Sequence, residues 1–220
     1  ALPPQTIEKT IVNKITLQTK KLAKSLNVIG FINIQFAIQN KKIFILEVNP
    51  RGSRTIPFVA KSTGVPLVKI ASQIMIGKKL SDFKLSNRKI NHISVKEAVF
   101  PFARFPGTDV ILGPEMKSTG EVMGIGLTFG EAFAKSQLGA GINLPLEGKV
   151  FISIKDDDKN IVVPIAKNLK NLGFTICATS GTAKYLNDNK IETQYIKKVI
   201  EGRPNAVDAM LSKEIQLVIN

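Results

Sequence analysis

Phe31–Arg54 has the sequence FINIQFAIQNKKIFILEVNPRGSR, and this stretch decides the fold of the first part of the chain. On either side of its middle, the even positions from 32 to 38 and from 44 to 48 are apolar, and several of the odd positions are polar. The apolar positions are Ile32, Ile34, Phe36, Ile38, Phe44, Leu46 and Val48, and the polar ones include Asn33, Gln35, Glu47 and Asn49. Such alternation indicates β-strands with one buried face and one open face. Because Asn40, Lys41 and Lys42 interrupt it, we predict a β-hairpin with a short polar turn.

The register of this hairpin follows from the polarity of its two faces. A three-residue loop centred on Lys41 keeps polar residues opposite polar residues and apolar opposite apolar. The cross-strand pairs it predicts are Gln35–Glu47, Asn33–Asn49, Phe36–Leu46 and Ile34–Val48. A loop one residue shorter or longer would set Gln35 against Leu46 or Val48 and mix the two faces.

In this register Gln35, Glu47 and Asn49 point into one space, and each offers a side-chain oxygen. One carboxylate with amide oxygens suits a hard cation such as Mg²⁺ better than zinc, and a site of this kind takes further ligands from water and nucleotide phosphates. Arg51 and Arg54 follow directly, and guanidinium groups grip phosphate or carboxyphosphate oxygens bidentately. The alternative is a half-buried sheet whose polar face is only solvated.

Length and composition limit the classes of protein to which the chain can belong. A chain of 220 residues can bury a substantial core and fits one or two domains. Its single cysteine, Cys177, excludes an internal disulfide framework. The chain does not open on a signal-peptide pattern, and its longest apolar stretch, 28–38, is too short to span a bilayer. We therefore expect no membrane association and a cytoplasmic location.

The net charge of +14, from 31 basic and 17 acidic residues, raises the question of nucleic acid as a partner. The lysines are spread along the chain, however, and the chain has no tryptophan and only two tyrosines. A platform of aromatic and basic residues for stacking bases is absent from the sequence. We predict that the chain does not bind nucleic acid and that part of the charge serves anionic substrates.

Further elements of the first part follow from periodicity and end signals. We predict helices at 6–26, 67–75 and 128–138, strands at 94–102 and 116–124, a helix start or irregular turn at 55–63 around Pro57, and turns at 105–107 and 113–114. Thr128 can cap its helix together with Glu131. His92, the only histidine, is assigned no role, because a lone histidine beside a polar connector is usually structural.

A cluster of glycine and proline at 139–148 marks a domain boundary, and beyond it the pattern becomes βαβ. We predict strands at 150–154, 174–178 and 215–220, and helices at 161–172 and 205–213, with Asp156–Asp158 as a solvated turn before the first helix. Thr179–Thr182, TSGT, follows a strand and enters another helix, so it has the form of a phosphate cradle. Hydroxyl-bearing helix caps are common, so an ordinary cap is the alternative.

Several of these stretches together resemble one family. QFA, EVNPR and PFVAKSTGVPL resemble ATP-grasp proteins, and specifically the large chain of carbamoyl phosphate synthetase. SVKEAVFPFARFPG, LGPEMKSTGEVMG, TFGEAFAKSQLG and EGRP extend the resemblance over essentially the whole chain. It implies an α/β fold class, in which the C-terminal part of an α+β ATP-grasp domain, 1–76, precedes a connector, 77–141, completing the synthetic half. A truncated Rossmann-like parallel βαβ domain, similar to methylglyoxal synthase, occupies 142–220.

The resemblance implies an ATP-dependent ligase that makes carbamoyl phosphate from bicarbonate, glutamine-derived ammonia and two ATP for arginine and pyrimidine synthesis. This half would phosphorylate carbamate, with Mg²⁺ or Mn²⁺ as the metal and a glutaminase small chain as partner. Gln35 and Glu47 would then bind the metal and ATP, and Asn49 would complete the metal ligands. Arg51 and Arg54 would hold the transferring phosphoryl oxygens.

The same resemblance implies effector sites. Residues matching contacts of a nucleotide effector, UMP or IMP in bacterial members, are Lys159, Thr179, Thr182, Lys198 and Asn220. Glu97 matches a contact of the activator ornithine, and the alternative for it is an exposed strand glutamate.

A Gly-rich phosphate loop and an adenine-binding segment do not precede the hairpin, so we expect a fragment that is inactive by itself. Two other functions stay open on the sequence: a different ATP-grasp ligase such as a carboxylase, and a non-catalytic nucleotide-binding regulatory module. The oligomeric state is open as well.

Overall fold

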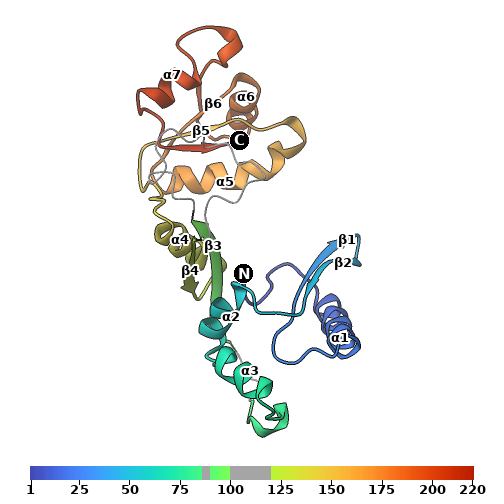
Figure 1. Cartoon of the computed structure of the whole chain (residues 1–220). Helices are drawn as coiled ribbons and strands as arrows, with labels where there is room; N and C mark the ends of the chain where they lie inside the picture. Colours follow the sequence, from blue (N-terminus) through green and yellow to red (C-terminus); the bar gives the residue numbers. More distant parts are fainter. Residues whose placement is uncertain (86–89, 100–119) are drawn as a thin grey trace. The chain divides into compact units, whose positions relative to one another are not determined.

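The computed structural model describes residues 1–85, 90–99 and 120–220, and it divides the chain into two compact units, Ala1–Ile142 and Asn143–Asn220 (Figure 1). The turns predicted at 105–107 and 113–114 lie outside the described residues, as do the end of the strand predicted at 94–102 and the start of the one at 116–124.

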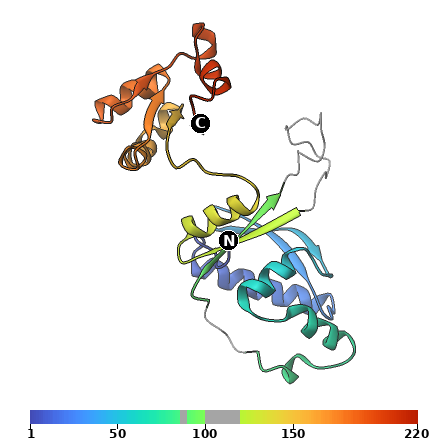
Figure 2. The same cartoon turned by 90° about the vertical axis from the view of Figure 1, so that its left-hand side faces the viewer.

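The first unit opens with helix α1, Lys9–Ser25, which begins three residues later than predicted and ends one residue earlier. Ile11 is its buried residue, and Lys24 in the last turn is favourable for the helix dipole. The hairpin follows as β1, Asn33–Gln39, and β2, Lys42–Asn49. Figures 1 and 2 both show α1 lying alongside this hairpin.

The hairpin register is the predicted one at its base and differs at its tip. Gln35 lies opposite Glu47, and the neighbouring pairs Asn33–Asn49 and Ile34–Val48 are also as predicted. The three-residue loop and the Phe36–Leu46 pair are wrong. The turn is the two residues Asn40 and Lys41, both with positive φ, and the shift this introduces is corrected by a bulge at Leu46.

The bulge changes which side chains share a face at the hairpin tip. Phe36 pairs with Ile45, and Ala37 pairs with Phe44. Since side chains alternate along a strand, Phe44 lies on the face of Gln35 and Glu47 and not on the apolar face where the sequence pattern placed it. Leu46, as the extra residue, is 65% exposed, so the expectation of one fully buried apolar face is wrong for this part of the hairpin.

Two helices follow the hairpin, α2 at Thr55–Thr63 and α3 at Leu67–Met75. Pro57 is accommodated in the first turn of α2, where its missing N–H has no intrahelical acceptor to lose. Gly64 ends α2 in the left-handed conformation, and Pro66 precedes α3, whose bounds are those predicted. A short 3₁₀ helix, η1, spans Leu80–Asp82.

The last layer of the first unit is an antiparallel pair covered by a helix. Strand β3, Ile93–Val99, pairs with β4, Gly120–Gly126, and α4, Phe129–Gly139, packs against them. Thr128 accepts a hydrogen bond from the backbone N–H of Glu131, as the predicted cap requires. The helix approaches β4 so closely that a Cβ at Gly124 would overlap the backbone carbonyl oxygen of Ala132.

The second unit is a parallel four-stranded sheet between helical layers. Its elements are β5 Lys149–Ile152, η3 Asp156–Asp158, α5 Lys159–Asn171, β6 Thr175–Ala178, α6 Ser180–Asp188, β7 Gln194–Tyr195, η4 Val199–Glu201, α7 Ala206–Leu211 and β8 Leu217–Ile219. The strand order is β7-β6-β5-β8, and all neighbours are parallel. The two-residue β7 was not predicted, because so short a strand has no alternation to detect.

Each face of this sheet buries its own apolar cluster. On one face Val150, Ile152 and Ile176 pack with residues of α5 and α6. On the other face Phe151 and Cys177 pack with residues of α7. Successive strand residues therefore serve opposite layers, as a sheet covered on both faces requires, and the predicted α/β class is confirmed.

Substitution of Gly124 by alanine tests the β4–α4 packing. The new methyl group meets the helix backbone and not a flexible side chain, so the first unit should lose about 1–3 kcal/mol of unfolding free energy. Gly130→Ala is the matched control, because open space surrounds that position in α4 and alanine favours helix. Urea unfolding of the two variants measures the difference, and equal stability for both would contradict the packing.

The thiol of Cys177 reports on the core of the second unit. It is 2% exposed, and burial raises its pKa, so at a given pH a smaller fraction is the reactive thiolate than for an exposed thiol. We expect the native chain at pH 8 to react with a disulfide reagent many times more slowly than the urea-unfolded chain, which should titrate one thiol. Labelling at the rate of a free thiol in the native chain would be inconsistent with this core.

Candidate functional site

The base of the hairpin opens onto a cleft of about 700 Å³ in the first unit. It is lined by the polar face of the hairpin, the turn that leads into α2 and the first turn of that helix, one face of the β3–β4 pair, and Val68 of α3. The charged and amide residues that line it are Asn33, Gln35, Glu47, Asn49, Arg51, Arg54, Lys96 and Glu121. All five residues predicted for metal, nucleotide and phosphoryl binding are therefore brought to one cleft.

Glu47 is at the centre of the amide cluster. The Nε2 of Gln35 donates to one carboxylate oxygen at 3.1 Å, and the Nδ2 of Asn49 donates to the other at 2.5 Å. Rotation about the terminal torsion of either amide replaces its NH₂ group by its oxygen at the same place. The three side chains can then offer a carboxylate and two neutral oxygens, which is a ligand set that fits Mg²⁺ or Mn²⁺.

The two arginines lie on the turn at the end of β2. The Nη1 of Arg51 donates to the carbonyl oxygen of Gly52 at 2.9 Å, and its other N–H groups bond to no acceptor within the described part of the chain, so they can face the cleft. Arg54 precedes the first residue of α2 and also lines the cleft. A guanidinium beside a carboxylate–amide cluster is suited to hold an anionic group while a cation neutralises the rest of its charge.

Two cleft residues were missed by sequence reasoning, Lys96 and Glu121. Their side chains form an ion pair at 3.1 Å, and the Nζ of Lys96 also lies 3.5 Å from the Oγ1 of Thr55. Alternation along VKEAV shows that Lys96 and Glu97 point to opposite faces, but the sequence does not say which face meets the cleft.

Glu97 points away from the cleft. It lies opposite Val122 in the β3–β4 pair, and Val122 is the residue that a Cβ on Gly139 of α4 would touch. The half-buried Glu97 is therefore on the face that carries α4. It is separate from the cleft residues.

The residues proposed for an effector all gather at the carboxyl edge of the parallel sheet in the second unit. Thr179 and Thr182 follow β6, Lys159 follows β5 after η3, Lys198 follows β7, and Asn220 follows β8. The carboxyl ends of parallel strands are where α/β proteins bind ligands, because the strands there feed into loops and helix N-termini.

Lys159 is the most enclosed cation of this edge. Its side chain is 14% exposed, and its Nζ lies 2.7 Å from the carboxylate of Asp156. The same Nζ is 3.3 Å from where a Cβ on Gly181 would stand and 5.8 Å from the centre of the Tyr185 ring. The ammonium group is thus held beside the N-terminus of α6.

The two threonines of the TSGT loop differ in their surroundings. The Oγ1 of the buried Thr182 lies 3.3 Å from both the backbone N and the backbone O of Ile154, so it ties the segment that follows β5 to α6. Thr179 occupies the N-cap position of α6, but its side chain does not accept a hydrogen bond from the helix. Of the two hydroxyls, only that of Thr182 is engaged in a bond between elements.

The loop that carries Lys198 is held by its own polar contacts. The carboxylate of Glu201 accepts the backbone N–H of Lys198 at 2.7 Å and the O–H of Tyr195 at 3.0 Å. These two donors, the backbone N–H first, lower the pKa of Glu201 below its ordinary value. The position of Lys198 is therefore fixed without a ligand.

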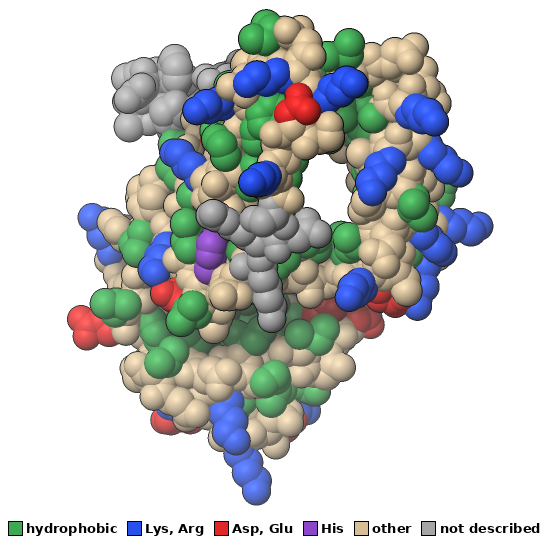
Figure 3. All heavy atoms as spheres, turned by 90° about the horizontal axis from the view of Figure 1, so that it is seen from below, with side chains coloured by type: hydrophobic (Ala, Val, Ile, Leu, Met, Phe, Trp, Pro, Cys, Tyr) green, Lys and Arg blue, Asp and Glu red, His purple; other side chains and the backbone are tan. Residues whose placement is uncertain are grey.

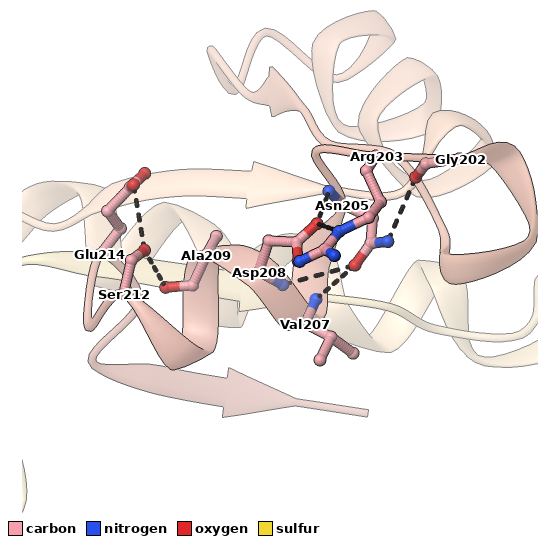
Figure 4. Close-up of polar contacts among 8 residues, drawn as sticks. All are labelled: Gly202, Arg203, Asn205, Val207, Asp208, Ala209, Ser212 and Glu214. Atoms are coloured by element: carbon pink, nitrogen blue, oxygen red, sulfur yellow. Dashed lines mark hydrogen bonds and ion pairs between the residues drawn. The ribbon is translucent and has the colours of Figure 1, made fainter.

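Figure 4 shows the second half of this loop, where the EGRP stretch enters α7. Arg203 bonds the carboxylate of Asp208 through two nitrogens, and the pKa of Asp208 is lowered chiefly by this guanidinium. Asp208 in turn accepts the backbone N–H of Asn205, whose side chain caps α7. EGRP is thus a loop-ordering motif in this unit.

Other site classes find little support in the described parts of the chain. Groups of three or more histidine, cysteine, aspartate or glutamate side chains that could hold a metal do not occur among those residues. Within the same residues, every helix is too short or too polar to cross a bilayer. Lysine and arginine side chains are scattered over the face shown in Figure 3 and do not form a single patch.

Comparison with known proteins agrees with the division of the chain into two units. The family model "Carbamoyl-phosphate synthase L chain, ATP binding domain" matches residues 1–83, and the model "MGS-like domain" matches residues 161–220. Carbamoyl phosphate synthase large chains from Myxococcus xanthus, Pasteurella multocida and Archaeoglobus fulgidus are 55%, 52% and 51% identical to the chain over its whole length. The chain spans about a fifth of the length of these relatives, 20% or 21% of each. It belongs to the family of carbamoyl phosphate synthase large chains, of which it carries part of an ATP-binding domain and an MGS-like domain.

Proposed function

We propose that the cleft of the first unit is part of the site that phosphorylates carbamate with ATP to give carbamoyl phosphate. The observation that carries this proposal is the convergence of Gln35, Glu47 and Asn49 with Arg51 and Arg54 on one cleft. Phosphoryl transfer needs little covalent work from a protein, and it depends on neutralising charge and holding donor and acceptor in line.

Each group has a distinct task in this proposal. Glu47, with the amide oxygens of Gln35 and Asn49, holds Mg²⁺ or Mn²⁺, and Gln35 and Glu47 thereby also contact the nucleotide. The bound metal neutralises negative charge on the phosphate oxygens and orients them. Arg51 and Arg54 stabilise the charge that spreads over the transferring phosphoryl group.

The wider reaction follows from the family. A full-length large chain would combine bicarbonate, ammonia and two ATP, with the ammonia released from glutamine by a small-chain partner, and would supply arginine and pyrimidine synthesis. ATP as a substrate and the free thiol of Cys177 are both consistent with a cytoplasmic location.

The second unit is proposed to bind a nucleoside monophosphate effector of the UMP or IMP type. Lys159 and Lys198 would meet the phosphate, Thr179 would offer its uncommitted hydroxyl, and Thr182 and Asn220 would complete the edge of the sheet. Glu97, on the α4 face of the first unit, is proposed as a contact for the cationic activator ornithine.

Replacement of Glu47 by glutamine tests the cleft. In a full-length large chain that contains this segment, loss of the only carboxylate among the metal ligands should lower carbamoyl phosphate formation at least about a hundredfold, since metal stabilisation of transition-state charge is worth several kcal/mol. The reverse reaction, ATP formation from ADP and carbamoyl phosphate, isolates this half and should fall equally.

The control for this experiment is Glu8→Gln, which removes an exposed carboxylate of the same unit that pairs with Lys41. It should leave both rates unchanged. Full activity in Glu47→Gln would overturn the assignment. Phosphorylation of other carboxylic acids in place of carbamate would instead favour a different ATP-grasp ligase.

Replacement of Lys159 by alanine tests the effector site. Loss of a charge-assisted contact to phosphate should weaken UMP or IMP binding by the 220-residue chain about 10- to 100-fold, measured by isothermal titration calorimetry. Lys170→Ala is the matched control, because Lys170 is in the last turn of the same helix, where it pairs with Glu192. Equal affinities in both variants would remove Lys159 from the site.

A further inference from the structure

One carboxylate occupies the carboxyl edge of the second unit where the proposed phosphate would arrive. Asp156 lies 2.7 Å from the Nζ of Lys159, the cation that the proposed effector would use. Lys198, from the loop after β7, also acts on this carboxylate, and both lysines lower its pKa, Lys159 more strongly. Lys159 is thus the cation that this carboxylate contacts directly.

The two side chains of this ion pair differ in how far they can move. The side chain of Lys159 is 14% exposed and is held beside Gly181 and Tyr185, whereas the side chain of Asp156 is 92% exposed. Lys159 therefore cannot move far, but Asp156 can rotate into water at little cost. Because the carboxylate of this ion pair is exposed and solvent screens its charge, a ligand with more negative charge can displace it.

The neighbouring aspartates do not share this arrangement. Asp158 pairs with Lys155 at 3.5 Å, on the preceding residues of the chain. Asp157 belongs to the same 3₁₀ turn, η3, and ion pairs involving it do not occur within the described part of the chain. The contact with Lys159 is therefore specific to Asp156 and is not a general effect of three adjacent acids.

We propose that Asp156 is a tethered competitor of the effector phosphate: its carboxylate occupies Lys159 in the empty site and must leave when the phosphate binds. This inference rests on the proposed nucleotide-binding function and adds a residue that sets the affinity of the site.

The test compares Asp156→Asn with Asp157→Asn in the 220-residue chain, with UMP and IMP as the probes in calorimetric titrations at 150 mM salt. Both variants remove one negative charge from the same turn, but only the first removes the competitor. Asp156→Asn should bind about two- to fivefold more tightly than the wild type, the factor expected for loss of an ion pair whose carboxylate is screened by solvent. Asp157→Asn should change affinity less, and Asp156→Glu should bind like the wild type.

Two outcomes overturn the inference while leaving the proposed function intact. In one, the wild type binds UMP or IMP and Asp156→Asn gains no more affinity than Asp157→Asn. In the other, Asp156→Asn binds more weakly, which would mean that Asp156 orders Lys159 for the ligand.

A second measurement does not depend on nucleotide binding. After reductive ¹³C-methylation, the signal of Lys159, assigned with Lys159→Arg, should shift in Asp156→Asn and stay in place in Asp157→Asn. An unchanged signal in Asp156→Asn would overturn the ion pair itself. If the signal shifts as expected but all variants fail to bind either nucleotide, the proposed effector function fails and the contact between Asp156 and Lys159 stands.

Discussion

One extra residue in β2 sets the geometry of the cleft. The two-residue turn at Asn40 and Lys41 would by itself place Gln35 opposite Leu46, because strand pairing counts residues from the turn. The bulge at Leu46 adds the missing residue, so Gln35 meets Glu47 and the polar face is continuous from there to the arginines of the following turn. The cost is exposed apolar surface at the hairpin tip, where Leu46 is 65% exposed.

The second unit also brings its candidate residues together, but it does so through the pairing of parallel strands. Its candidate residues are spread from Lys159 to Asn220, and parallel strand pairing brings them to one edge of the sheet. The apolar clusters on both faces fix the sheet, and local polar networks then fix the loops: Glu201 holds the backbone of Lys198, and Arg203 with Asp208 orders the entry to α7. Burial supplies the stability of this unit, and hydrogen bonds supply the positions of its charged groups.

Both candidate sites contain internal polar pairs that need little free energy to open. Glu47 is held by two amides, Lys96 by Glu121, and Lys159 by Asp156. Pairs that are partly exposed to water order their side chains without locking them, because solvent screens much of their attraction. An arriving cation or phosphate can therefore exchange partners with residues that are already in place, and the net charge of +14 favours anionic ligands.

The sequence by itself determined the alternation of the hairpin, the pairing of Gln35 with Glu47, the bounds of α3, the cap at Thr128 and the parallel βαβ pattern of the second unit, because periodicity and end signals are local. Tertiary structure alone decided the remainder. The two-residue turn and the bulge shift the register in opposite directions, and together they give the same Gln35–Glu47 pair as a three-residue loop without a bulge. The polarity of the sequence therefore could not distinguish the two arrangements. The face of β3 that meets the cleft depends on its pairing with β4 and on the packing of α4, so the roles of Lys96 and Glu121 were hidden. The ion pair between Asp156 and Lys159 joins residues three apart and is local, but the enclosure of Lys159 beside Gly181 and Tyr185 depends on how α5 packs against α6.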